Sequence, residues 1–387
     1  MAFVKTLAWF GVTILSAVLC FGQTFTVGST TTQLNPSQRG SVGTYWPDGN
    51  MGAIFHNGTN YVFAPTTAPG TVQITLPSLN TWTSGLSLNA PTTNLAYGGA
   101  NSFDQNYAGG QAVYYDSASG YLIELYHGEQ HFCGFNCGGS PSYSALGLAY
   151  STDFGNNWHK LGEVISPQSA WTNGGVNCQA DVSMGTLLVV GSYLYTYYDD
   201  NGTGCSGEQL AVARASISSV VAAAVAGTPF TSGPGTLFMK YTGSGAWTGN
   251  GVTDLANPQN GGGAFAAIAT DPNGGGIYMP SVRYDTYLNQ YILAYSNFDE
   301  AVLMTSSDGL TWGNSQNIVT GGGAPPNAIF YTTLFNTSGG DPQVLGQNFS
   351  VFYVAPFGTW SNSNLYSVAI SVGSRPAPPV LNQPVVN

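Results

Sequence analysis

Short apolar runs rich in β-branched and aromatic residues recur along the chain, and turn-forming residues separate them. The clearest pair is Val113 to Asp116, which leads through a turn ending at Gly120 into Tyr121 to Tyr126. Val282 to Asp285 and Tyr291 to Tyr295 repeat the same V-x-Y-D, turn and aromatic-strand order, with a turn one residue longer. Runs of this length and composition, bounded by such turns, are typical of β-hairpins.

Three weaker pairs extend this pattern to five hairpins. They run from Ala53 to Phe63, from Leu187 to Tyr198 and from Ile329 to Val354. Five units between Gln23 and Ser374 leave roughly 70 residues for each, enough for a four-stranded blade with long loops. The sequence therefore predicts an all-β fold, a single five-bladed β-propeller domain over residues 23–374. A six-bladed propeller, a β-sandwich and a β-helix are the alternatives.

Two segments depart from the strand pattern. Ile217 to Ala226 is rich in alanine and aliphatic residues and contains no glycine or proline, so we predict a helix there, as an insertion on the surface. The residues after Ser374 include the run Arg375 to Pro379, with three prolines. Residues 375–387 are therefore expected to form an extended C-terminal tail.

Two turns contain serine, aspartate, glycine and tryptophan in the same order, and the second has one residue fewer between the aspartate and the glycine. Their residues are Ser151, Asp153, Gly155 and Trp158 in the first turn, and Ser306, Asp308, Gly309 and Trp312 in the second. In such a turn the aspartate accepts hydrogen bonds from nearby backbone N–H groups, the glycine adopts a positive φ and the tryptophan packs inward. These segments resemble the Asp-boxes of sialidase-like β-propellers. The motif is structural, so it indicates a fold and only indirectly a function.

The first 22 residues have the order of charge and apolarity of a secretory signal peptide. Lys5 supplies the positive charge, Leu7 to Phe21 form the apolar run, and Gly22 is the small residue before an expected mature N-terminus at Gln23. An N-terminal membrane anchor is the alternative, but the run is shorter than the ~20 residues that a membrane-spanning helix needs. We therefore expect a secreted protein, extracellular or periplasmic, with no membrane attachment after cleavage.

Four of the five cysteines follow this segment, at Cys133, Cys137, Cys178 and Cys205. An even number of cysteines in an oxidising compartment suggests two disulfides. A Cys133–Cys137 bond would close a small loop, and a Cys178–Cys205 bond would join the ends of a two-strand segment. The sequence alone leaves this connectivity open. A metal site is the alternative, but the C-x-x-C spacing is absent.

Charged residues are scarce in this chain. They make up 6% of it, compared with roughly 25% in ordinary soluble domains, and the net charge is −11 from 7 basic and 18 acidic residues. This balance disfavours nucleic acids and anionic membranes as partners, because both require clusters of lysine and arginine. Aromatic residues reach 13% and glycine contributes 52 residues. Such a composition suits neutral polar ligands, above all carbohydrates, although a tyrosine-rich sheet core explains most of the same residues.

The direction of the strands predicts where acidic residues gather. The strands of a blade alternate in direction from the axis outward. The start of the first strand, the end of the second strand and the start of the third strand therefore lie on one face of the propeller. The turns at Asp153 and Asp308 lie on the other face. Before the first strands stand Asp48, Asp104 and Asp181, and at the ends of second strands stand Glu129, Asp199, Asp200, Asp299 and Glu300.

The chain has only five glutamates, and Glu129 lies between His127 and His131. These three residues form either a structural network or part of an active site, with both histidines as ligand-binding residues. A metal site on the two histidines is a third possibility, but residues i and i+4 on a loop lack a defined geometry. No cofactor is predicted, and a structural Ca²⁺ ion is left open.

This layout resembles the five-bladed propeller glycoside hydrolases, the arabinanase, xylosidase and invertase group. The resemblance covers the blade pattern over most of the chain. It implies that Asp48 is the base or nucleophile and that Asp104 or Asp181 tunes the pKa of the acid. Glu129 is the candidate acid, but it lies at the end of a second strand, whereas that group usually takes its acid from the start of a first strand. The alternative for Asp48 is a turn-forming residue after Pro47.

Three further side chains are candidate ligand-binding residues. Trp46 precedes Asp48 and could form a wall of a sugar subsite, while Arg214 and Arg283 either meet a ligand or pair with aspartates in the blades. Sialidase activity is disfavoured, because sialidases need three arginines around the substrate carboxylate and a Tyr/Glu nucleophile pair. After residue 22 the chain has only four arginines, and it lacks an F-R-I-P motif.

Two functions are therefore compatible with the sequence. The first is a secreted, monomeric glycoside hydrolase-like protein that acts on a neutral glycan. In that reaction a carboxylic acid protonates the leaving oxygen, while a carboxylate activates water or attacks, and their separation decides between inversion and retention. The second is a non-catalytic carbohydrate-binding or surface-interaction propeller. The two functions differ in one structural requirement: only the hydrolase needs two carboxylates that converge at the axis.

Overall fold

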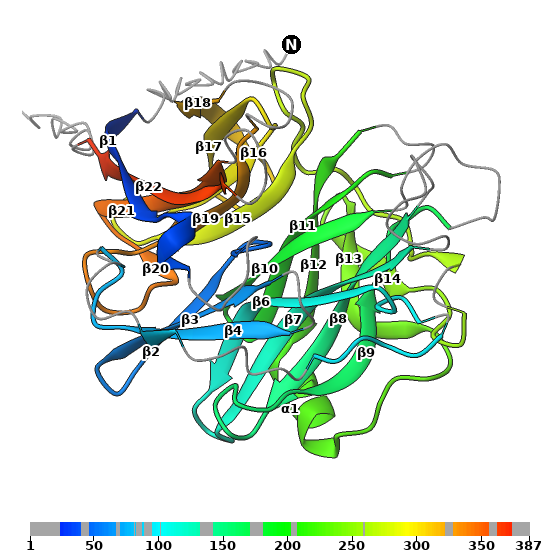
Figure 1. Ribbon diagram of the computed structural model, residues 1–387. Coiled ribbons are helices and arrows are strands. Elements are labelled where there is room, and N and C mark those ends of the chain that lie inside the picture. Colours follow the sequence, from blue (N-terminus) through cyan, green and yellow to red (C-terminus); the bar gives the residue numbers. More distant parts are fainter. Residues whose placement is uncertain are drawn as a thin grey trace, which may run out of the picture.

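The computed structural model is a five-bladed β-propeller, with five β-sheets arranged around a central axis (Figure 1). The predicted fold is therefore confirmed, and the six-bladed, sandwich and β-helix alternatives are excluded. The structure describes residues 24–39, 46–66, 70–80, 82, 87–88, 95–100, 102–131, 142–170, 181–202, 207–257, 260–321, 328–355 and 362–373.

Blades 1 and 2 are four-stranded antiparallel sheets whose strands follow chain order from the axis outward. The strands of blade 1 are β2 (Gly52–His56), β3 (Thr59–Pro65), β4 (Thr71–Leu76) and β5 (Ser87–Leu88). Those of blade 2 are β6 (Tyr107–Asp116), β7 (Tyr121–His131), β8 (Ser142–Ser151) and β9 (His159–Ile165).

Blades 3 and 4 each have a fifth strand. The strands of blade 3 are β10 (Val182–Val190), β11 (Tyr193–Asp200), β12 (Gln209–Ser216), β13 (Gly235–Gly243) and β14 (Ala246–Val252). Those of blade 4 are β15 (Tyr278–Asp285), β16 (Gln290–Ser296), β17 (Glu300–Ser306), β18 (Gly313–Thr320) and the short β20 (Val344–Leu345). The β20 strand pairs parallel to β15, on the axial side of the blade.

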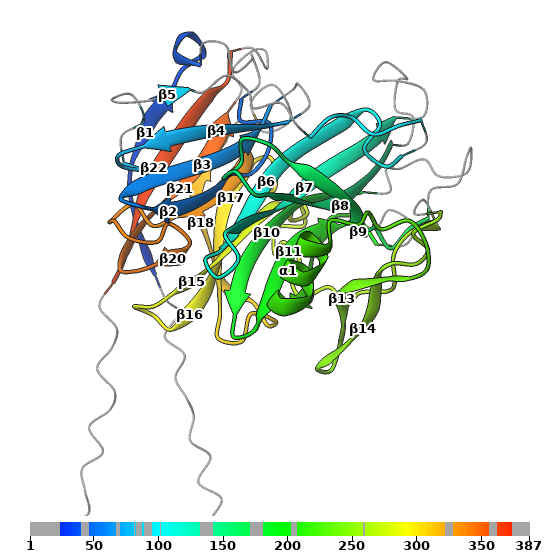
Figure 2. The ribbon, with the colours of Figure 1, turned by 90° about the horizontal axis from the view of Figure 1, so that it is seen from below.

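Blade 5 combines strands from both ends of the chain and so closes the ring. Its strands, from the axis outward, are β19 (Phe330–Phe335), β21 (Asn348–Ala355), β22 (Asn364–Val372) and β1 (Phe25–Leu34). The antiparallel pairing of β1 with β22 extends from Phe25↔Val372 to Leu34↔Leu365, and the two strands lie side by side in Figure 2. A short 3₁₀ helix, η1 (Pro36–Gln38), follows β1.

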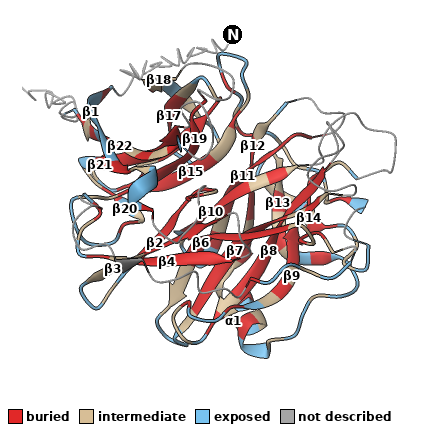
Figure 3. Cartoon of the chain, in the orientation of Figure 1, coloured by how far each residue is buried: buried red, intermediate tan, exposed pale blue. Residues whose placement is uncertain are grey.

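The apolar runs of the sequence form the interior of the blades. Figure 3 shows buried residues concentrated in the strands and exposed residues in the loops at the rims. In β7, for example, Leu122, Ile123, Leu125 and Tyr126 are all buried. Both faces of a blade pack against neighbouring blades, so both faces need apolar side chains. This explains why the strands read as continuous apolar runs rather than as an alternating pattern.

The predicted helix is present as α1 (Ile217–Ala226). The side chain of Ser216 accepts a hydrogen bond from the backbone N–H of Ser219 (3.1 Å) at its start, and Gly227 ends it with a φ of 60°. Only Val220 and Ala224 are buried within the helix, which lies on the surface of blade 3. Among the described residues, no helix is long and apolar enough to cross a membrane.

The two serine–aspartate–glycine turns connect the third and fourth strands of blades 2 and 4. In the first turn Asp153 accepts a hydrogen bond from the backbone N–H of Asn157 (2.8 Å), Gly155 has a φ of 86°, and Trp158 is buried. The turn at Asp308 repeats this pattern, with a backbone hydrogen bond of 2.7 Å and a glycine φ of 73°. These contacts stabilise the ends of the hairpins.

Three predictions concern residues outside the described part of the chain. They are the signal peptide at residues 1–22, the C-terminal tail at residues 375–387, and both disulfides, which involve Cys133, Cys137, Cys178 and Cys205.

Candidate active site

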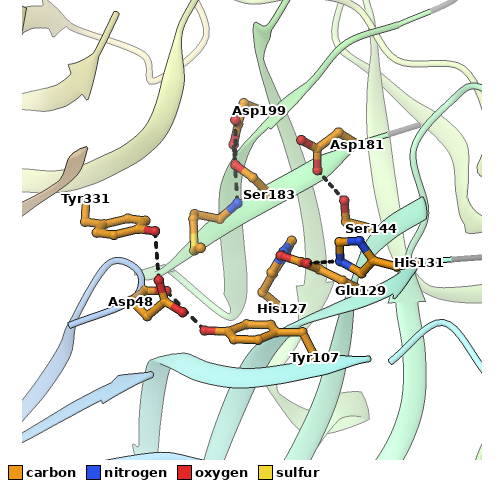
Figure 4. Close-up of polar contacts among 11 residues, drawn as sticks. Asp48, Tyr107, His127, Glu129, His131, Ser144, Asp181, Ser183, Asp199 and Tyr331 are labelled. Atoms are coloured by element: carbon orange, nitrogen blue, oxygen red, sulfur yellow. Dashed lines mark hydrogen bonds and ion pairs between the residues drawn. The ribbon is translucent and has the colours of Figure 1, made fainter. Parts of the chain in front are cut away.

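One end of the propeller axis gathers carboxyl groups from the first three blades. Figure 4 shows Asp48, Glu129, Asp181 and Asp199 around a common space. Glu208 joins them, because the charges of Asp181 and Asp199 act directly on its carboxyl group and raise its pKa. We call these five residues the acid cluster.

The strand directions explain why these residues meet. Asp181 directly precedes β10, Asp199 lies near the end of β11, and Glu208 directly precedes β12. The register of blade 2 pairs Glu129 with Ser144 at one end of the sheet and Leu122 with Ser151 at the other. The acid cluster therefore occupies the end of the blades opposite the serine–aspartate–glycine turns.

Asp48 is held by three blades. Its backbone N–H donates to the carbonyl of Pro65 (3.0 Å), and the hydroxyl of Tyr107 donates to the carbonyl of Asp48 (3.1 Å). The hydroxyl of Tyr331, from blade 5, donates to Oδ1 of Asp48 (3.0 Å). Burial raises the pKa of Asp48 to about 6, although the hydrogen bond from Tyr331 favours the carboxylate.

A β-bulge directs the Tyr331 hydroxyl toward Asp48. Tyr331 has a φ of 57°, in the left-handed region that non-glycine residues seldom adopt. The register between β19 and β21 shifts between Phe330 and Thr333, so Tyr331 is the residue of the irregular segment that reaches Asp48. Backbone strain of this kind persists where the surroundings fix it, and it is frequent at functional sites.

Glu129 is clamped by two histidines. Nε2 of His127 lies 3.0 Å from Oε1, and Nε2 of His131 lies 2.5 Å from Oε2. Burial alone would raise the pKa of Glu129, but the hydrogen bonds and charges of the two histidines outweigh it and lower the pKa to about 2. Glu129 is therefore ionised at neutral pH. A carboxylate in this state cannot donate a proton, which argues against the predicted role of Glu129 as the acid.

The other three carboxyl groups of the acid cluster, those of Asp181, Asp199 and Glu208, have raised rather than lowered pKa values. Oγ of Ser144 donates to Asp181 (2.5 Å) and Oγ of Ser183 donates to Asp199 (2.6 Å), whereas the buried Oε2 of Glu208 has no partner among the described residues. Burial raises the pKa of all three, and neighbouring negative charges raise each further. One cluster therefore contains an ionised carboxylate and three carboxyl groups whose pKa values are raised.

Comparison with known proteins identifies the fold. No protein-family model and no curated protein matches the chain. The catalytic domain of the Coprinopsis cinerea GH62 α-L-arabinofuranosidase superposes with a TM-score of 0.50 and 13% identity, over 92% of this chain and 99% of that one. The Xanthomonas citri GH43_1 enzyme complexed with xylose gives a TM-score of 0.50 and 10% identity, over 90% and 93%. The fold is that of the five-bladed propeller glycoside hydrolases. The resemblance to sialidase-like propellers remains a prediction.

Within this glycoside hydrolase-like fold, Asp104 is not brought to the acid cluster. Its carboxylate lies 2.5 Å from Nζ of Lys160 and accepts a hydrogen bond from the hydroxyl of Tyr126 (3.2 Å). Lys160 belongs to β9, the outermost strand of blade 2, so Asp104 is directed away from the axis. Of the two candidates for tuning the acid, the geometry favours Asp181.

Trp46 is part of the core. Its ring is 1% exposed and packs against Trp82, with the ring centroids 6.1 Å apart. Arg39 donates a hydrogen bond to its carbonyl (3.4 Å). The ring therefore supports the turn that carries Asp48, and it does not present a free wall to a sugar.

The two arginines proposed as ligand-binding residues lie toward the other end of the blades. Arg214 stacks on Tyr193 and Trp247, with its guanidinium carbon 4.6 and 4.3 Å from the ring centroids. Arg283 is buried and donates a hydrogen bond to the carbonyl of Leu187 (3.1 Å). Both arginines bind residues of their own or the adjacent blade.

The sequence analysis missed several residues of this site. Glu208 precedes the third strand of blade 3, which is one of the positions that strand direction places on this face, so the same rule could have found it. Tyr97 is 41% exposed and lies near Glu129, while Tyr278 lies near Glu208, as the effects of these charges on the tyrosine pKa values indicate. Neither tyrosine belongs to a motif. Only the fold brings them to the acid cluster.

The described residues contain no group of three or more histidines, cysteines and acidic residues that could hold a metal ion. His127 and His131 both direct Nε2 at Glu129. In this geometry the three residues form a hydrogen-bonded Glu–His network.

Proposed function

We propose that this protein is a secreted glycosidase that acts on a neutral glycan, with Glu208 as the general acid and Asp48 as the base or nucleophile. The observation that carries the proposal is the convergence of five carboxyl groups with divided protonation at one end of the axis. Glycoside hydrolysis requires this division, because one group donates a proton while the other is ionised.

Glu208 has the properties of the acid. Burial and the charges of Asp181, Asp199 and Asp200 raise the pKa of Glu208, so that it stays protonated at neutral pH. Its Oε2 is buried and has no hydrogen-bond partner among the described residues, so no described group competes for a proton on this oxygen. Asp181 is the neighbour whose charge acts most strongly on Glu208, which suits the tuning role that the resemblance assigned to it.

Asp48 has the properties of the base. With a pKa of about 6 it is ionised at neutral pH, and it is more basic than an ordinary aspartate. The nearby negative charge of Glu129 contributes to this shift. Tyr107 and Tyr331 fix the position of Asp48, so that little reorganisation is needed before reaction.

The charge of the site selects the substrate class. Asp48 and Glu129 are ionised at neutral pH, and these negative charges would repel uronic and sialic acids. Tyr97 and Tyr278 offer aromatic surface at the site, which suits the apolar face of a neutral sugar. Because the compared structures are an arabinofuranosidase and an enzyme complexed with xylose, arabinosides and xylosides are the first candidates.

Hydrolysis of a panel of neutral aryl glycosides tests this proposal. Glu208→Gln should reduce kcat by roughly 100- to 10,000-fold, the range that general acid–base catalysis contributes. Glu300→Gln is the matched control. Glu300 begins the third strand of blade 4, as Glu208 precedes the third strand of blade 3, but it binds Asn273 (3.0 Å) outside the acid cluster. Equal losses in both variants, or wild-type protein that binds glycans without cleaving any, would favour the non-catalytic carbohydrate-binding propeller.

A further inference from the structure

Three hollows in series cross the face of the propeller opposite the acid cluster. The first, of about 360 Å³, lies between the β10–β11 hairpin and Tyr284. The second, of about 430 Å³, shares Asp341 and Val344 with the first. The third, of about 380 Å³, shares Ser338 and Asn348 with the second and continues along blade 5. We call this series the opposite-face groove.

The lining of the groove is almost free of charge. Among the described residues that line the three hollows, Asp341 is the one that carries a charge. The polar remainder consists of neutral side chains, among them Tyr284, Tyr291, Gln343 and Asn348. Amides and hydroxyls that can both donate and accept hydrogen bonds match the hydroxyl groups of neutral sugars.

Two tyrosines give the first hollow an aromatic wall. The rings of Tyr284 and Tyr291 lie with centroids 5.1 Å apart and planes at 70°. Both side chains are half-buried, so they are anchored while part of each ring faces the hollow. Rings held in this way offer contact area to the C–H faces of a sugar with little loss of conformational entropy.

The wall beside Asp341 is fixed by contacts across the axis. Nε2 of Gln343 donates to the carbonyls of Ala53 in blade 1 (2.8 Å) and Val113 in blade 2 (3.1 Å). Oδ1 of Asp341 accepts a hydrogen bond from the backbone N–H of Gln343 (2.9 Å), and β20 pairs with β15 directly after it. A preorganised wall lowers the entropy cost of binding.

We propose that the opposite-face groove is a second glycan-binding site, which holds an extended chain of a neutral polysaccharide. The series of hollows suits several consecutive sugar units rather than a single one. No lysine or arginine stands among the described lining residues, and together with the charge of Asp341 this disfavours nucleic acids and acidic polysaccharides. The site uses no residue of the acid cluster, so it does not rest on the proposed catalytic function.

Affinity electrophoresis in gels containing soluble neutral polysaccharides, such as arabinan, xylan or mixed-linkage β-glucan, tests the site. The full chain carrying Asp48→Asn serves as the parent, so that the polymer is not consumed. Tyr291→Ala should weaken binding by about tenfold, as expected when an aromatic contact is removed from a binding site. Asn348→Ala, at an exposed position that is safe for folding, should weaken it by a smaller factor.

Tyr121→Ala is the matched control. Tyr121 begins the second strand of blade 2 near the position that Tyr291 holds in blade 4, and it packs against Tyr150 with centroids 5.6 Å apart. This variant should bind like the parent. The proposal is overturned if no neutral polymer binds, or if Tyr291→Ala and Asn348→Ala bind normally while Tyr97→Ala at the acid cluster abolishes binding. Tighter binding of polygalacturonate or RNA would also overturn it, and aryl glycoside hydrolysis reports separately on the catalytic proposal.

Discussion

The two ends of the propeller axis use the same strands in different ways. In β7, Tyr121 at one end stacks on Tyr150, whereas Glu129 at the other end is held by two histidines next to further carboxylates. Short hairpin turns close the first end, and its groove carries a single charge. The comparison indicates that the blades confine mutually repelling acids to the end where strand starts from several blades converge, and that the other end is built for stability and neutral contacts.

The largest effect should come from Asp48→Asn. Removal of the charge should reduce kcat by roughly 100- to 10,000-fold and leave the thermal midpoint nearly unchanged, because the Tyr331 hydroxyl can still donate to the amide oxygen and the Tyr107 hydroxyl donates to the backbone carbonyl, which the substitution does not alter. Steady-state kinetics and thermal unfolding measured on the same preparations check this. If the loss of activity follows a loss of stability, Asp48 is a turn residue. The two ends of the axis then do not differ in catalytic function.

Asp104→Asn should have the converse effect. It breaks the pair between the buried Asp104 and the partly exposed Lys160, which should lower the free energy of unfolding by about 2 kcal/mol. The kcat value should change little, because Asp104 is directed away from the acid cluster. Chemical denaturation and kinetics at a temperature well below the midpoint separate the two effects. A large fall in kcat with unchanged stability would instead place Asp104 in the catalytic machinery.

The pH dependence of kcat/KM sharpens the role of Glu129. The pKa of Asp48 is raised to about 6, so a base at this position loses activity as the pH falls through about 6. In Glu129→Gln a neighbouring negative charge is removed, which should lower the pKa of Asp48 and move this limb to lower pH. If the acidic limb of the profile does not move, the charge of Glu129 has no effect on the pKa of Asp48, and the role of Glu129 is limited to its contacts with the two histidines.

Gly58→Ala should have the smallest effect. Gly58 has a φ of 81° in the β2–β3 hairpin, and an added Cβ would meet no atom within 4 Å. The cost is therefore one of backbone conformation alone, about 1 kcal/mol in the free energy of unfolding, with no change in kcat. A fall in kcat in this variant would mean that the two ends of the axis are coupled.

Much of the fold could be predicted from local pattern. All five hairpins and α1 were expected from runs of apolar residues and their turns, because both faces of each blade are buried. The outermost strand β1 could not be recognised in the same way. Seven of its residues, from Thr26 to Thr32, are exposed, so its sequence lacks an apolar pattern and its pairing with β22 depends on the closure of the whole ring.

The site was only partly predictable, for a different reason. Strand direction correctly placed Asp48, Glu129 and Asp181 at one end of the axis. It also selected Asp104, which does not reach the acid cluster. Whether an aspartate at such a position faces the axis depends on its neighbours. Asp104 does not, because it pairs with Lys160 on the outermost strand of the blade. The φ of Tyr331, which brings its hydroxyl to Asp48, likewise depends on a bulge that no local sequence signal specifies.

The pairing of β1 with β22 has a consequence for how the protein is made. A ribosome releases the first of these strands long before the second, with more than 300 residues between them. Blades 1 to 4 can pair locally as they emerge, whereas β1 waits for its partner, and contacts this distant in sequence form slowly. The seven exposed, threonine-rich positions of β1 then have a use beyond the native state. They keep the waiting strand soluble and give other chains little apolar surface on which to aggregate.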